Sequence, residues 1–300
     1  MYFTFMRYFV TYYFILIIKL SWAQLDNYQS YYSQIYVAEM EKFNGDFQKS
    51  FISYKSAFEN YFPFQKDLLG IIKVSDSLEI KVGLTKEQKE YINLIRNFNE
   101  IFYSNDIFRN YKIDSIEFLK FKKHFKFIKQ NDFCNISEEN FYIVSEIQQM
   151  LNTDQFIRKI KKSTFKDSLL IKVDKENNIR LRKLINQYGY PNQRELGITG
   201  SMVYTLLLHI TISEDLTSFE DSLLNKQVIC GNLPPENYAK LIDRFNVWKL
   251  SGKQVYGTWI LNGVITKEEI QKFEDLDIRR KNIFLEPFSE YCKKNHIRLL

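Results

Sequence analysis

The chain has 300 residues, which is enough for about two domains of ordinary size. Hydrophobic residues make up 45% of it and charged residues 26%, while glycine and proline are scarce, so collagen-like, disordered and turn-rich all-β proteins are excluded. The net charge of +6 is spread along the sequence and does not indicate binding to nucleic acid. We expect a mainly α-helical globular protein with an aromatic-rich core.

Residues 1–23 have the three parts of a cleavable signal peptide. Arg7 precedes an apolar run from Tyr8 to Ile18, and small residues stand at Ser21 and Ala23, the −3 and −1 positions of a cleavage site. The run is shorter than the ~20 residues that a transmembrane helix needs. The sequence predicts an exported protein, periplasmic or secreted, that meets the membrane only through this segment before cleavage. An uncleaved anchor or a buried first helix is the alternative.

Two neighbouring segments predict a pair of amphipathic helices. Apolar residues recur at three- and four-residue steps over Tyr28–Asn44 and Phe47–Tyr61, with a turn at Gly45 between them. Small residues fall where the two helices would approach closely: Ala38, Ser50 and Ala57. The unit resembles a tetratricopeptide repeat on Gly45, Asp46, Phe47, Tyr54 and Ala57. Because one unit cannot form a stable stack, further helices of this region, residues 24–134, are expected to complete it.

A polar, turn-like segment at residues 131–137 ends the helical region, and a C-terminal domain, residues 135–300, follows it. Capping boxes at Thr85 and Thr266 and the dipeptide Pro234-Pro235 predict three helix starts.

One short stretch of the C-terminal domain predicts β structure. Residues 254–261 are rich in β-forming side chains and lie between two turn signals, Ser251-Gly252 and Asn262-Gly263. We expect a small β-hairpin that displays Gln254, Tyr256 and Thr258 on one face, because strand residues alternate between faces. In the functional interpretation this face forms the wall of a pocket. In the structural alternative the hairpin is a flap packed on helices.

The C-terminal domain also carries short polar motifs in a fixed order. Each motif is weak alone, but together, over about residues 145–292, they resemble a bacterial family named only as a domain of unknown function, six-six-two-four. The residues that carry the resemblance are Asp154, Gln155, Arg158, Asp174, Asn178, Tyr188 to Pro191, His209, Asp243, Arg244, Gln254, Tyr256 to Thr258, Asp277, Arg279, Arg280, Leu285, Pro287 and Tyr291. The resemblance implies candidate site positions and no reaction.

This sequence departs from the family pattern at two positions. The family has glutamine where this chain has Leu208 and Trp259. If those amides orient a ligand in the family, this chain binds differently or is inactive.

Three residues are the candidates for catalysis. His209 lies in an otherwise apolar helical segment, where it could act as a general acid or base beside a carboxylate such as Asp243 or Asp154. Asp243 and Arg244 are neighbours on a predicted helix and point about 100° apart, so each is expected to pair elsewhere, Asp243 with His209 and Arg244 with an anion. The structural alternatives are a buried, bonded histidine and internal ion pairs between helices.

The leading hypothesis is an exported binding protein with a polar, arginine-containing ligand pocket in the C-terminal domain. Its partner is an unknown protein or a small polar or anionic ligand, and its predicted ligand-binding residues are Asp154, Gln155, Arg158, Gln254, Tyr256, Thr258, Arg279 and Arg280. The alternative is a hydrolase that uses His209 with Asp243 and Arg244.

No metal or cofactor is predicted, since the usual catalytic and phosphate-binding motifs are absent from the sequence. The three cysteines, Cys134, Cys230 and Cys292, are odd in number and widely spaced, which favours buried or partly buried thiols over one disulfide and a free thiol.

Overall fold

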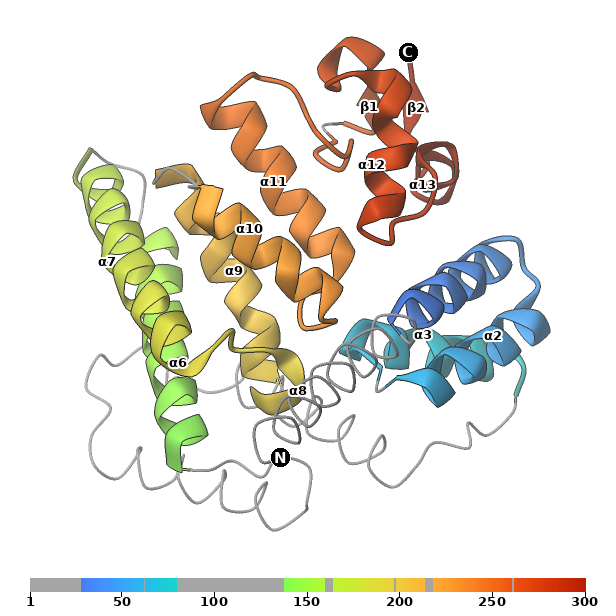
Figure 1. Cartoon of the computed structure of the whole chain (residues 1–300), viewed down its shortest axis with the longest axis horizontal. Coiled ribbons are helices and arrows are strands. Elements are labelled where there is room, and N and C mark those ends of the chain that lie inside the picture. The colour runs from blue at the N-terminus through green and yellow to red at the C-terminus, as the bar shows by residue number, and fades with distance from the viewer. Residues whose placement is uncertain are drawn as a thin grey trace, which may run out of the picture.

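A computed structural model of the protein describes residues 28–61, 63–79, 138–159, 164–196, 198–213, 218–260 and 262–300. This part of the chain is mainly helical, as predicted (Figure 1). Residues 28–43 form the first described helix. The helices that follow are α2 (Phe47–Asn60), α3 (Gln65–Ser77), α6 (Glu138–Lys159), α7 (Thr164–Tyr188), α8 (Gln193–Leu196), α9 (Ile198–Ser213), α10 (Ser218–Ile229), α11 (Pro235–Lys249), α12 (Leu276–Asn282) and α13 (Phe288–Lys294).

The N-terminal helices form the predicted helical hairpin. Gly45 turns the chain between residues 28–43 and α2 with a φ of 82°, a conformation that glycine adopts without steric cost. Ala38 and Ala57 are buried, and the Ser50 hydroxyl donates a hydrogen bond of 2.8 Å to the Ala38 carbonyl. The close approach predicted from the small residues is therefore confirmed. Helix α3 packs on α2 and closes an aromatic-rich core.

The C-terminal domain is built around α9. Its residues are apolar on nearly every side, a composition typical of a helix buried on all sides, and α6, α7, α8 and α11 pack against it. Helices α6 and α7 pair along their length at one end of the long axis of the molecule, whereas α2 and α3 lie at the other end (Figure 1). Helix α11 begins at Pro235, as the proline pair predicts.

The β structure differs from the predicted hairpin. Its two strands, β1 (Val264–Ile265) and β2 (Arg298–Leu299), pair in parallel, and residues 255–260 form an irregular loop. Gln254 makes an isolated bridge to Ile270. The alternation over residues 254–261 therefore reflects side chains that anchor a loop and not the two faces of a strand. The capping box at Thr266 is present and opens the short 3₁₀ helix η2 (Lys267–Glu269); a second one, η3 (Phe273–Asp275), precedes α12.

Several predictions fall on residues that the structure leaves undescribed: the signal peptide, the capping box at Thr85, Cys134 and the domain boundary at 134/135. Cys230 and Cys292 are free thiols, one half-buried and one buried. No helix within the described ranges has the length and apolar character needed to span a bilayer.

The two parts of the molecule meet at the turn between α10 and α11. The Tyr61 hydroxyl donates a hydrogen bond of 3.0 Å to the Gly231 carbonyl, and the buried ring of Tyr28 lies against Gly231. Gly231 has a φ of 70°, and a Cβ atom added there would lie 2.1 Å from the Tyr28 ring.

Replacing Gly231 by alanine is expected to lower the free energy of unfolding by about 3 kcal/mol, because backbone strain of about 1–2 kcal/mol adds to overpacking against Tyr28. The matched control is Gly252→Ala, since Gly252 has the same φ, 71°, but open space around it. Chemical denaturation of both variants measures the difference. Equal losses would show that the contact between Tyr28 and Gly231 adds nothing to stability.

Candidate functional site

Four of the polar side chains singled out from the sequence meet on neighbouring helices. Arg158 on α6 is the centre of the cluster: its guanidinium lies 2.9 Å from Asp154 on the same helix and 3.0 Å from Asp174 on α7. The Asp154 carboxylate reaches His209 on α9 at 2.9 Å. Asp154 is buried, whereas the side chains of Arg158 and His209 are 27% and 17% exposed, so a ligand can reach the two nitrogen-bearing groups.

His209 is held at its Nδ1 atom. This atom lies 2.9 Å from Asp154 Oδ2 and 3.1 Å from Arg158 Nε. A ring protonated at Nδ1 donates to the carboxylate, and a ring unprotonated there accepts from the guanidinium. The pocket therefore fixes the orientation of the ring in either tautomer. When Nδ1 carries the proton, Nε2 is left to accept one, as a general base requires.

The two carboxylates of the cluster differ in acidity. Burial pushes the pKa of Asp154 upward, but hydrogen bonds from His209 and Arg158 outweigh it and hold the pKa below the usual value. Burial raises the pKa of Asp174 to about 6, since Arg158 opposes burial only in part and the charge of Asp154 adds to it. Asp174 thus changes charge in mildly acidic solution.

Arg244 on α11 lies near Arg158 and Asp174 and forms no ion pair with an acid in the described part of the chain. Its guanidinium stacks over the Trp259 ring at 5.1 Å, and its Nε atom is buried with no hydrogen-bond partner among the described residues. Burial, followed by the positive charge of Arg158, lowers the pKa of Arg244. Arg244 is therefore a partly desolvated cation, and no described carboxylate is bonded to it.

Asp243, the neighbour of Arg244, serves a different purpose from the one expected. Its fully buried carboxylate accepts hydrogen bonds of 2.6–2.7 Å from the backbone N–H groups of Val255, Tyr256 and Thr258 and from the Thr258 hydroxyl. The expected pairing of Asp243 with His209 is therefore wrong, because His209 bonds Asp154 and the Asp243 oxygens hold the loop. Asp243 and Arg244 do not pair with each other, as expected, but the anionic partner expected for Arg244 is not found among the described residues.

The remaining predicted ligand-binding residues belong mainly to this loop. The Gln254 amide bonds both the N–H and the carbonyl of Trp259, at 2.7 and 2.8 Å. Arg279 donates to the Val255 carbonyl, and the fully buried Arg280 donates to the carbonyls of Tyr256 and Glu286. These side chains converge, but on the backbone of residues 254–259 rather than on a hollow. Gln155 differs: its amide donates to Asp154 at 2.8 Å, at the edge of the Arg158 cluster.

Two members of the cluster were not among the predicted site residues. Asp174 appears in the sequence only as part of a motif, and Trp259 only as a departure from the family pattern. The cation–aromatic contact with Arg244 depends on a loop whose path no local pattern reveals. Within the described ranges, no group of three or more His, Cys, Asp or Glu side chains is placed to hold a metal ion.

No family model, no curated protein and no solved structure matches the chain. The family resemblance drawn from the motifs therefore stays a prediction, and the function has to be argued from the geometry of the site.

The raised pKa of Asp174 predicts a change of stability with pH. Because its pKa is higher in the folded protein than in the unfolded chain, stability is lost as the pH rises from about 3.8 to about 6, by up to about 3 kcal/mol in total, and the loss then stays constant at higher pH. Asp174→Asn removes this cost, so the stability of the variant relative to wild type should increase between pH 4 and pH 7. Asp167→Asn, at an exposed position of the same helix, is the control. Parallel pH profiles for Asp174→Asn and wild type would contradict this assignment.

Proposed function

We propose that the protein is an exported binding protein whose C-terminal domain binds a small anionic ligand at the Arg158 cluster. The observation that carries the proposal is the state of Arg244, which is partly desolvated, stacked on Trp259 and without a bonded carboxylate. A partly desolvated guanidinium without a bonded acid is costly, and a carboxylate or phosphate that accepts hydrogen bonds from it lowers that cost.

The neighbouring groups favour the same class of ligand in mildly acidic solution. Arg158 is paired with two carboxylates, so the two arginines and the two aspartates carry no net charge while both acids are ionised, and an excess positive charge appears once Asp174 is protonated. His209 is partly exposed and can donate a hydrogen bond from Nε2 whenever that atom carries a proton. Protonation of Asp174 near pH 6 removes a negative charge from the cluster, so anion affinity should rise as the pH falls from 8 to 5.5.

Anion binding can be measured directly by calorimetry with inorganic phosphate and with succinate. Arg244→Gln is expected to weaken binding by about tenfold or more, since a charge-assisted hydrogen bond contributes ~1.5–3 kcal/mol. The matched control is Arg180→Gln, because Arg180 lies in the same domain but is bonded to Glu146 at 2.8 Å. The proposal fails if neither anion binds the wild type, or if both variants bind as tightly as the wild type.

The contact of 2.9 Å between Asp154 and His209 Nδ1 favours one second candidate, a hydrolase. A carboxylate on Nδ1 stabilises the imidazolium that forms when Nε2 takes a proton from water or from a hydroxyl nucleophile. In this version the acid partner is Asp154 and not Asp243, and Arg244 would stabilise the anionic transition state.

His209→Ala distinguishes the hydrolase from the binding protein. General-base catalysis contributes about 10²–10⁴ to a rate, so a loss of that size across a panel of ester, amide and phosphate ester substrates supports the hydrolase. His296→Ala is the control, since His296 is exposed and contacts Phe43 at the far side of the molecule. Equal turnover in the wild type and His209→Ala, or no turnover in either, argues against this candidate and leaves the binding protein untouched.

A further inference from the structure

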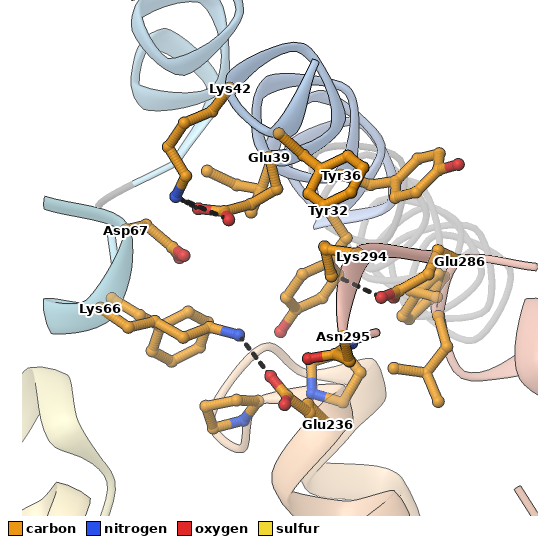
Figure 2. A pocket seen from close by; sticks show the side chains of 17 residues that line it. Tyr32, Tyr36, Glu39, Lys42, Lys66, Asp67, Glu236, Glu286, Lys294 and Asn295 are labelled. Carbon is orange, nitrogen blue, oxygen red and sulfur yellow. Dashed lines mark hydrogen bonds and ion pairs between the residues drawn. The ribbon is translucent and has the colours of Figure 1, made fainter. Parts of the chain in front are cut away.

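A cavity of about 500 Å³ lies between the N-terminal helices and the C-terminal domain. Figure 2 shows that side chains from the first described helix, from α3, from the start of α11 and from the α12–α13 region face into it. It is thus separate from the Arg158 cluster, which is built on α6, α7 and α9. Its lining includes Tyr32, Phe64, Lys66, Asp67, Glu236 and Phe284.

One wall of the cavity is a stack of aromatic rings. Tyr32 stacks on Phe284 with ring centroids 5.4 Å apart and on Phe64 with centroids 6.3 Å apart, the planes inclined by 19° and 13°. Phe284 comes from the C-terminal domain and the other two rings from the N-terminal part, so the wall exists only when the two parts are packed together. Such a wall offers apolar area to the body of a ligand and negative ring faces to a cation.

The three lysines in the lining are each neutralised by a glutamate. Lys294 lies 2.6 Å from Glu286, Lys66 lies 3.2 Å from Glu236, and Lys42 lies 2.7 Å from Glu39. Glu236 is also paired, at 2.8 Å, with Lys240, which lies outside the lining. Figure 2 shows the three lining pairs on different sides of the cavity.

Asp67 is the fourth acid of the lining and forms no ion pair among the described residues. It is 3% exposed, and its Oδ2 atom accepts a hydrogen bond from the Tyr31 hydroxyl. Burial raises the pKa of Asp67 to about 6, against the opposing charge of Lys66. Among the lining residues four acids face three lysines, and Asp67 is the acid that forms no ion pair with a described residue.

We propose that this cavity binds a small organic cation with an apolar body, the ammonium group against Asp67 and the body against the Tyr32–Phe284 wall. The chemistry selects this ligand class because an anion would meet the carboxylate of Asp67, which forms no ion pair with a described residue, and a neutral molecule would leave that carboxylate without a counter-charge. The site does not depend on the proposed anion site at Arg244, so either can fail without the other.

The charged groups facing Asp67 determine how binding depends on pH. They are Lys66 on its own helix, Glu39 and Lys42 on the first described helix, Glu236 on α11, and Glu286 and Lys294 near α13. Burial pushes the pKa of Glu39 upward, but bonds from Lys42 and Tyr54 bring it below its usual value, and the charge of Lys66 chiefly lowers that of Glu236. Both glutamates stay ionised above pH 5, so Asp67 is the acid that titrates near pH 6. Cation affinity should therefore rise from pH 5 to pH 7.5.

Three probes of similar size test the proposal on the mature full-length protein: 2-phenylethylammonium, 2-phenylethanol and 3-phenylpropanoate. The cation should bind at least about tenfold more tightly than the alcohol and the anion at pH 7.5. Asp67→Asn keeps an oxygen for the Tyr31 hydroxyl and should abolish both the preference for the cation and its pH dependence. Asp76→Asn, at an exposed position of the same helix, is the matched control and should behave as the wild type.

The proposal is overturned if the wild type binds none of the probes or binds the cation and the alcohol equally. It is also overturned if Asp67→Asn, with the circular dichroism spectrum of the folded wild type, retains the preference for the cation. A second variant, Phe284→Leu, removes a ring from the wall and leaves every charge in place. This variant should weaken the binding of both the cation and the alcohol. An unchanged affinity for both would show that the ligand binds elsewhere.

Discussion

The carboxylate of Asp243 accepts four hydrogen bonds from residues 255–258, and much of the C-terminal domain depends on this arrangement. These residues have no strand partner along most of their length, so their backbone N–H groups need another acceptor when they are buried. One carboxylate on a rigid helix supplies it. The fully buried Arg280 donates a hydrogen bond to the Tyr256 carbonyl. The loop is thus fixed by side chains in place of a sheet.

The same arrangement positions the candidate site. Because consecutive residues on a helix point in different directions, Asp243 can hold the loop while Arg244 faces the cluster on α6, α7 and α9. The loop in turn presents Trp259, whose ring lies over the Arg244 guanidinium. Arg244 therefore keeps its position through an aromatic contact and not through an ion pair with a described residue. A carboxylate in place of Trp259 would have neutralised the group that is proposed to bind the anion.

Local features of the sequence predicted several of the helices. The spacing of Phe and Tyr gave the first two helices almost to the residue, and Pro234-Pro235 gave the start of α11. The hairpin at residues 254–261 was wrong, because alternation is produced equally by a strand and by a loop whose alternate side chains are anchored. The partner of His209 was one of two acids, Asp154 or Asp243, and only the packing of α9 against α6 distinguishes them. The cavity gave no signal, since Tyr32, Asp67, Glu236 and Phe284 are far apart in the sequence.

The two proposed sites lie at charged side chains that lack an ion pair among the described residues, whereas most other buried charges have one. Most ionic groups in the core regions have a clear internal partner, as Asp154 has in Arg158 and Glu236 has in Lys66. Arg244 and Asp67 are of opposite sign, and each lies beside aromatic rings that reduce its hydration. A charge without an ion pair beside aromatic rings lowers the stability of the folded protein. A ligand of opposite charge that binds only the folded state raises that stability again. A site of this kind selects its ligand first by charge, because the same desolvation that weakens the empty protein strengthens every electrostatic contact with the ligand.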